Sequence, residues 1–129
     1  MNKKPAAKKG FIRIWNALIY SLNGLRIAIT QETSFKQEIV IYIVVLIVLF
    51  FLPLSFVFKC LLFFANTIVL IVEIINSAIE SIVDMASPDY HDLAEKGKDL
   101  GSAAVFISMV LAIALWICAI YLMLMEKGA

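Results

Sequence analysis

The sequence predicts an all-α membrane protein, organised as one domain over residues 1–129, with an amphipathic surface helix and three transmembrane helices. Hydrophobic residues make up 63% of the chain and its mean hydropathy is +0.96, which is more apolar side chain than a soluble domain of this size can bury. Long apolar runs follow a basic start. Cys60 and Cys118 lie in these runs, and we expect them to be small buried hydrophobic residues rather than a disulfide pair.

The N-terminal part differs from the apolar runs. Residues 1–10 are basic and lack apolar periodicity, which predicts a disordered tail. Residues 11–30 have one apolar face, and a polar stripe that includes Arg13 and Tyr20 lies on another side. Such a helix lies in the plane of the membrane interface rather than crossing it. Its apolar face comprises Phe11, Ile14, Trp15, Leu18, Leu22, Leu25 and Ile29.

Pro53 ends the first of three apolar crossings. The first spans residues 33–52. It ends before Pro53 because proline cannot continue a helix and disfavours helical geometry in the residue before it. The second spans 54–87 and is about 50 Å long at 1.5 Å per residue, whereas the bilayer core is about 30 Å thick. Its end should therefore project into the cytoplasm. A polar connection, 87–99, precedes the third crossing, 100–125, which opens with small residues that permit close helix contact.

The basic residues predict the orientation. Seven of the eleven Lys and Arg residues precede the first long apolar run, and Lys96 and Lys98 lie in the polar connection. Because cytoplasmic loops carry an excess of Lys and Arg, we expect the N-terminus and the 87–99 loop to be cytoplasmic and the C-terminus to lie on the opposite side. The net charge is only +1, and no nucleic-acid partner is expected.

Acidic residues occur where a membrane helix should avoid them. In the second crossing, Glu73, Asn76, Glu80 and Asp84 recur at i, i+3, i+7 and i+11, so they share one helical stripe. A carboxylate in hydrocarbon costs about 2.5–3.5 kcal/mol even on the mild insertion scale. The stripe should therefore face protein, a metal or a polar cavity, and it marks a candidate functional site.

Acidic residues of the other crossings should lie at the same depth. Glu73 follows Pro53 by 20 residues, or about 30 Å along the helix, and so reaches the cytoplasmic interface. Glu32 and Glu38 open the first crossing, and Asp99 opens the third. Three helices of one chain are expected to be too few to cover all of these groups, which favours an oligomer.

These residue types fit phosphoryl transfer at a membrane surface. Magnesium in such sites is held by one or two carboxylates plus substrate phosphates, and a further carboxylate can take the proton of the reacting hydroxyl. Lys98 and Arg13 can pair with phosphates, although the sequence has neither a P-loop nor a GxGxxG motif. Two other classes stay open: a small proton or cation pathway protein, for which intramembrane acids are also typical, and a structural assembly subunit.

Four motifs carry a resemblance to a known family. They are GFIR (10–13), YSLNGLR (20–26), EIINSAIESIVD (73–84) and YHDLAEKGKDLGSAA (90–104). Together they resemble the prokaryotic diacylglycerol kinase family over about residues 10–122. The resemblance implies a homotrimer of the bacterial inner membrane with composite active sites. Such an enzyme transfers the γ-phosphate of MgATP to diacylglycerol and produces phosphatidic acid. Undecaprenol kinase, from the same superfamily, is the alternative activity.

The resemblance also implies roles for individual residues. Glu73 would be the general base with Asn76 orienting groups beside it, and Glu32 and Glu80 would hold Mg²⁺. The lipid substrate would contact Arg13, Glu38, Glu73 and Ser102. ATP would contact Arg13, Tyr20, Glu32, Glu80, Asp89, Tyr90, His91, Lys98 and Asp99. Asp89 stands where relatives often have Glu, and its shorter side chain can alter a nucleotide contact.

Several of these residues also have a structural interpretation. Asp84 could cap the helix or form a salt bridge at its end, and Glu38 could pair with Lys36. His91 could be a solvated residue of a polar loop. Tyr20 could be an interfacial aromatic side chain, since tyrosine favours that level of the membrane.

Overall fold

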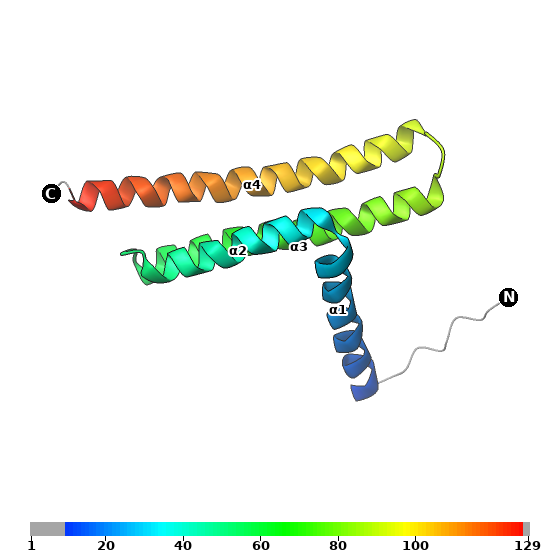
Figure 1. Ribbon diagram of the computed structural model, residues 1–129, viewed down its shortest axis with the longest axis horizontal. Helices are drawn as coiled ribbons and strands as arrows, with labels where there is room; N and C mark the ends of the chain where they lie inside the picture. The colour runs from blue at the N-terminus through cyan, green and yellow to red at the C-terminus, as the bar shows by residue number, and fades with distance from the viewer. Residues whose placement is uncertain (1–9, 128–129) are drawn as a thin grey trace.

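The computed structural model describes residues 10–127, in which all the regular secondary structure is α-helix. The helices are α1 (Phe11–Gln31), α2 (Thr33–Phe51), α3 (Phe56–Ala86) and α4 (Asp92–Lys127). Helices α2, α3 and α4 lie side by side along the long axis, and α1 lies crosswise to them (Figure 1). Helices α2, α3 and α4 are each long and apolar enough to cross a membrane, which confirms the predicted helical architecture. The homotrimer stays a prediction, and the predicted tail lies outside the described residues except for Gly10.

Helix α1 packs against α2 and buries very little of its own surface. Ala28 is its one buried residue, whereas Phe11, Ile14 and Trp15 are exposed. An apolar face left open on a helix that lies crosswise to the spans suits a position in the membrane interface. Glu32 is extended, with φ −87° and ψ 113°, and separates α1 from α2.

The reversal between α2 and α3 follows from Pro53 and Ser55. Leu52 is extended, with φ −69° and ψ 139°, because the proline ring disfavours helical geometry in the residue before it. The Ser55 hydroxyl oxygen accepts a hydrogen bond from the Phe58 N–H at 3.3 Å and so caps α3. Helix α3 therefore begins at Phe56, two residues later than predicted.

The connection between α3 and α4 is shorter than the predicted 87–99 loop. Helix α4 already begins at Asp92, because His91 caps it: the Leu93 N–H donates to His91 Nδ1 at 3.1 Å. Asp92 and Glu95 add negative charge to the first turn, where the helix dipole favours it. The segment expected to be a loop thus supplies the first two turns of α4, since a polar composition does not exclude a helix.

Small residues allow α3 and α4 to pack closely. Gly101, Ser108, Ala112 and Ala119 are buried along one side of α4, and side chains of this size let two helix backbones approach. Of the small residues expected to make contact at the start of the third crossing, only Gly101 is buried, and 102–104 are exposed.

The apolar core is small for a chain of this length. Leu49, Leu62 and Ala119 form it and join α2, α3 and α4. Most large apolar side chains are exposed, as lipid contact requires of spanning helices. Cys60 is half-buried and Cys118 is exposed, and both are free thiols. The prediction of a buried position is therefore wrong for Cys118, because its side of α4 is not covered within one chain.

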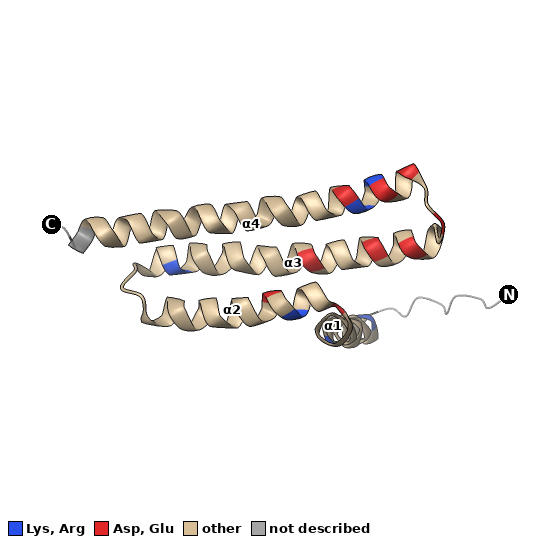
Figure 2. Cartoon of the chain, turned by 45° about the horizontal axis from the view of Figure 1, so that its top comes forward, with Lys and Arg blue, Asp and Glu red and all other residues tan. Residues whose placement is uncertain are grey.

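Charged residues gather at the end of the bundle where α1 joins it, where α3 ends and α4 begins (Figure 2). Lys59, the fourth residue of α3, lies near the opposite end of that helix. Helix α3 has 31 residues, or about 46 Å at 1.5 Å per residue, and exceeds the bilayer core of about 30 Å. Its charged end therefore extends beyond the hydrocarbon if the helix crosses the membrane.

Candidate active site

The deepest part of the acidic stripe on α3 is covered within one chain. Glu73 is 5% exposed and Asn76 is 8% exposed, whereas Glu80 is half-buried and Asp84 is exposed. Three helices therefore do not cover the whole stripe, as expected, although Glu73 and Asn76 are already covered within one chain. The reason for this coverage is the close approach of α4, which reaches Asn76 at the buried Gly101.

A polar pocket of about 410 Å³ lies between α2, α3 and α4 at this level. It brings together predicted site residues from all three helices, and Glu73 is within electrostatic range of both Glu80 and Glu32. Ser34 and Gln37 also line it and were not among the predicted residues. Their spacing with Glu38 along one face of α2 is the sequence signal that could have identified them. The lining residues are Ser34, Gln37, Glu38, Ile41, Glu73, Asn76, Glu80, Ser102, Val105 and Met109.

Two buried oxygens in this pocket lack a hydrogen bond from any of the described residues. One is Glu38 Oε2 and the other is Asn76 Oδ1. The opposite end of the Asn76 amide is occupied, because Nδ2 donates to Glu80 Oε1 at 3.0 Å. A buried acceptor without a donor is costly, so Glu38 Oε2 is available to a hydroxyl donor of a bound molecule.

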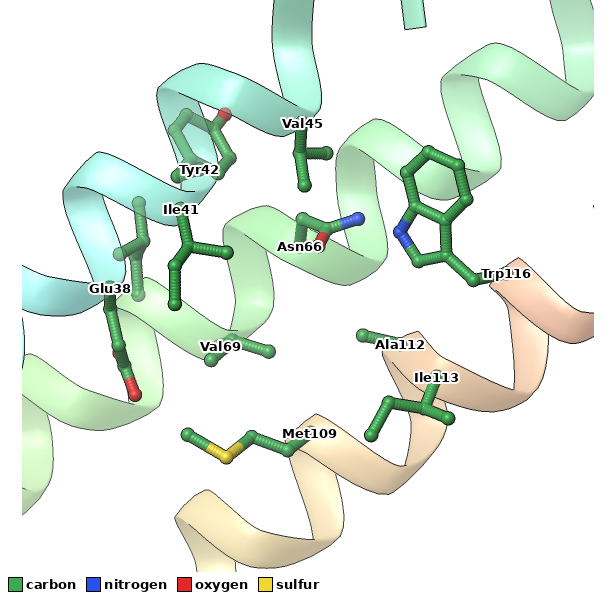
Figure 3. Close-up of a pocket in the computed structure, with 11 residues that line it drawn as sticks. Glu38, Ile41, Tyr42, Val45, Asn66, Val69, Met109, Ala112, Ile113 and Trp116 are labelled. Atoms are coloured by element: carbon green, nitrogen blue, oxygen red, sulfur yellow. The ribbon is translucent and has the colours of Figure 1, made fainter. Parts of the chain in front are cut away.

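An apolar pocket of about 350 Å³ continues from the polar one. The two pockets share Glu38, Ile41 and Met109. Figure 3 shows Glu38 at one end of the apolar pocket and Trp116 at the other. Between them lie Val45, Val69, Ala112 and Ile113. A site that is polar at one end and apolar beyond suits an amphipathic ligand.

A third pocket, of about 360 Å³, lies at the connection between α3 and α4. It contains all the residues of this connection and of early α4 that the resemblance assigns to nucleotide binding. Pocket residues come from the end of α3, the connection and the first turns of α4. They are Val83, Asp84, Ser87, Pro88, Asp89, Tyr90, His91, Ala94, Glu95, Lys98 and Asp99.

Several side chains of this third pocket already have partners. Lys98 Nζ forms an ion pair with Asp84 Oδ1, in agreement with the structural interpretation of Asp84. The Tyr90 hydroxyl donates to Glu95 Oε2 at 2.6 Å, and this hydrogen bond raises the pKa of Tyr90. Both pairs are reachable by solvent, so a nucleotide could exchange partners with them at little cost.

Three predicted residues lie outside these pockets. Arg13 and Tyr20 are exposed on α1, and the half-buried Glu32 lies at the junction of α1 and α2. None of the three lines a pocket described above. Because α1 lies crosswise to the bundle and packs mainly on α2, one chain does not bring these side chains into the site. Their predicted ligand contacts stay predictions.

The polar pocket suits a magnesium ion that is already bound to the phosphates of the nucleotide. Within residues 10–127, no group of three or more His, Cys, Asp or Glu side chains is arranged to hold a metal by itself. Magnesium does not require such a cage, since one or two carboxylates plus substrate phosphates suffice. Of the two residues expected to hold the ion, Glu80 supplies carboxylate oxygens to this pocket, which is the kind of donor that magnesium prefers.

Sequence comparisons identify the relatives of this chain. The sequence model described as prokaryotic diacylglycerol kinase matches residues 19–120. A diacylglycerol kinase of Escherichia coli is 41% identical over 107 residues, which cover 83% of this chain and 88% of the relative. One from Helicobacter pylori is 35% identical over 121 residues, covering 92% and 94%, and one from Pseudomonas aeruginosa is 38% identical over 107 residues, covering 83% and 87%. The expected resemblance is confirmed, and the chain belongs to the prokaryotic diacylglycerol kinase family.

Proposed function

We propose that the protein is a membrane-bound kinase that transfers the γ-phosphate of ATP to diacylglycerol and produces phosphatidic acid. One observation carries the proposal: the buried Glu73 lies in a polar pocket that continues into an apolar pocket. Diacylglycerol has the matching form, with one hydroxyl beside long apolar chains. Membership of the diacylglycerol kinase family supports the same reaction.

Glu73 is the proposed general base. Its carboxylate takes the proton of the primary hydroxyl of the lipid, and the hydroxyl oxygen then forms a bond to the γ-phosphorus. The bond between this phosphorus and the oxygen that bridges to the β-phosphate breaks, and ADP leaves. Burial favours this role, because a base in a water-poor pocket can abstract a proton from substrate without competition from solvent.

Glu80 and Glu32 are the proposed magnesium ligands, with Asn76 beside them. Bound magnesium would neutralise phosphate charge, which is the main catalytic requirement of phosphoryl transfer. Asn76 Nδ2 donates to Glu80 Oε1 at 3.0 Å and so restricts the orientation of that carboxylate. Glu32 lies at the junction of α1 and α2, so whether it reaches the magnesium depends on how α1 packs in the proposed trimer.

The nucleotide is proposed to bind between the polar pocket and the third pocket. Asp84 follows Glu80 by four residues on α3, or about 6 Å of helix rise, so a triphosphate can reach from one pocket to the other. Lys98 would exchange its Asp84 partner for phosphate oxygens. Asp89, Tyr90, His91 and Asp99 would contact the rest of the nucleotide, and Arg13 and Tyr20 would complete the site.

The lipid is proposed to enter with its hydroxyl beside Glu73 and its acyl chains in the apolar pocket. Glu38 Oε2 is buried and has no hydrogen-bond partner within residues 10–127. It lies at the border of the two pockets, where it can accept a hydrogen bond from the glycerol part of the lipid. Ser102 lines the polar side. Arg13 is assigned to the lipid by the resemblance, as a residue near the membrane surface.

The proposed location is the bacterial inner membrane. The charged end of the bundle would face the cytoplasm, where ATP is available, and the C-terminus would face the periplasm. The proposed assembly is a homotrimer with active sites shared between subunits. Support comes from the family resemblance and from the position of Arg13, Tyr20 and Glu32 outside the pockets of their own chain.

A radiolabel transfer assay tests the proposed function. Purified protein in mixed micelles is given labelled ATP with diacylglycerol or undecaprenol, each alone, and Glu73→Gln protein is the control. We expect label in phosphatidic acid and a higher kcat/KM for diacylglycerol. A higher kcat/KM for undecaprenol would identify undecaprenol as the substrate instead of diacylglycerol. No label in either lipid would refute the kinase activity.

A further inference from the structure

The closest approach of α4 to the acidic stripe of α3 occurs at Gly101. Gly101 is buried, and a Cβ built on it would overlap Asn76 Oδ1 and lie 3.3 Å from Asn76 Cγ. The overlap is with the end of a side chain that is itself 8% exposed. Asn76 therefore has little room to move away, and every residue other than glycine would displace its amide or separate the helices.

The same geometry determines which way the Asn76 amide points. Its Nδ2 donates to Glu80 Oε1 at 3.0 Å, and its Oδ1, which has no hydrogen-bond partner among the described residues, faces the Gly101 backbone. Because the built Cβ takes the place of one Cα hydrogen, Oδ1 lies close to that hydrogen of Gly101. Such contacts between helices are weakly favourable. The flipped amide would place Oδ1 against the Glu80 carboxylate, which is repulsive.

We propose that Gly101 is a positioning residue: by having no side chain, it holds the Asn76 amide in the orientation that directs Glu80. The inference deepens the proposed function and rests on it, since Glu80 matters as a magnesium ligand only if the protein is the proposed kinase. Gly101 itself touches neither substrate nor metal in this arrangement. Its effect on the reaction passes through Asn76 and then through Glu80.

Gly97 supplies a matched control on the same helix, one turn earlier. A Cβ at Gly97 would meet Val83 Cγ2 at 3.6 Å, an ordinary van der Waals contact. Gly97→Ala and Gly101→Ala therefore make the same chemical change in α4, with the same gain in helix propensity. Only the second introduces an atom into the space of the Asn76 amide.

The first experiment measures kinetics of the full chain in mixed micelles. Gly101→Ala should lower kcat by on the order of 10²-fold, because small misplacements in a catalytic site have effects of this size. It should also raise the free magnesium needed for half-maximal rate and leave KM for diacylglycerol nearly unchanged. Gly97→Ala should resemble the parent in all three. If Gly101→Ala keeps a kcat within about threefold of the parent and the same magnesium midpoint, positioning is refuted.

The second experiment measures unfolding temperature and needs no activity. Gly101→Ala should lower it by about 5 °C or more, and the loss should vanish when Asn76→Ala is also present, because the overlapping side chain is gone. If Gly101→Ala alone does not fold, recovery of a folded protein in the double variant supports the contact. An equal loss in both backgrounds would mean that the overlap is not with Asn76 and would refute the proposal.

The two experiments separate failure of this inference from failure of the proposed function. A parent that is inactive on both diacylglycerol and undecaprenol would refute the kinase function and the catalytic part of the Gly101 proposal. The unfolding temperatures of the single and double variants would still test the packing contact between Gly101 and Asn76. If the parent is active but Gly101→Ala lowers the unfolding temperature equally with and without Asn76→Ala, the Gly101 proposal is refuted and the kinase function stays intact.

Discussion

The polar pocket and the pocket at the α3–α4 connection contain similar residue types in opposite environments. In the first, Glu73 is 5% exposed and its surroundings are supplied by three helices. In the second, Asp84 and Lys98 form an ion pair that solvent reaches. Exposed pairs contribute little to stability and exchange partners easily, whereas buried polar groups tolerate few changes. The difference suggests chemistry in the first pocket and reversible nucleotide contacts in the second.

Removing the buried base should have the largest effect. Glu73→Gln keeps the shape of the side chain but cannot take a proton, so turnover should fall by roughly 10²-fold or more. The kcat of purified, folded variant with diacylglycerol is the measurement, and an unchanged oligomeric state is the control. A kcat within about threefold of the parent would exclude Glu73 as the base.

A mixing experiment asks whether the two pockets must come from the same chain. Glu73→Gln protein and Asp99→Asn protein, each nearly inactive alone, are unfolded together in equal amounts and reassembled. If Glu73 and Asp99 act from different chains of a trimer, about one quarter of the sites receive both intact residues, and activity should return to that level. Subunit exchange is verified by cross-linking.

Mixing without recovery would show that this pair acts within one chain. The structure makes that outcome a real alternative, since Glu73 and Asn76 are already covered by their own chain. The trimer itself would then need a separate test, such as the mass of the detergent-solubilised protein.

Magnesium dependence should distinguish Glu80 from residues of the exposed pocket. Glu80→Gln removes a proposed metal ligand, and the free magnesium at half-maximal rate should rise about tenfold. The apparent KM for diacylglycerol should change much less. Activity is titrated against free magnesium at constant ATP, with Asp84→Asn as the control. A magnesium midpoint and maximal rate equal to those of the parent would argue against Glu80 as a ligand.

Much of the fold follows from local patterns in the sequence. Pro53 and the apolar run lengths predict the spans, and the recurrence of Glu73, Asn76 and Glu80 predicts a polar face on α3. The start of α4 was less predictable, because its helical first turns depend on the cap at His91 rather than on hydrophobic periodicity.

The sequence predicted that the acidic stripe is shielded from lipid, but it could not predict that the same chain covers Glu73 and Asn76. Coverage of Glu73 depends on how closely α4 approaches α3, and at this level the closest contact is between Gly101 and Asn76. A pattern along a single helix contains no information about such a pair. The position of Arg13 and Tyr20 is likewise a property of how α1 joins the bundle.

The smallest effect is expected at the ion pair of the exposed pocket. Asp84→Asn removes the partner of Lys98, but water replaces the lost interaction because both side chains are accessible. The unfolding temperature should change by no more than about 2 °C, and the small difference should shrink further at high salt, which screens exposed charges. The KM for MgATP should fall slightly or stay constant, since Lys98 no longer has to leave a carboxylate before it meets a phosphate. A large loss of stability, or a KM that rises strongly while kcat is unchanged, would mean that Asp84 has a direct part in the nucleotide site and that the contrast between the two pockets is too simple.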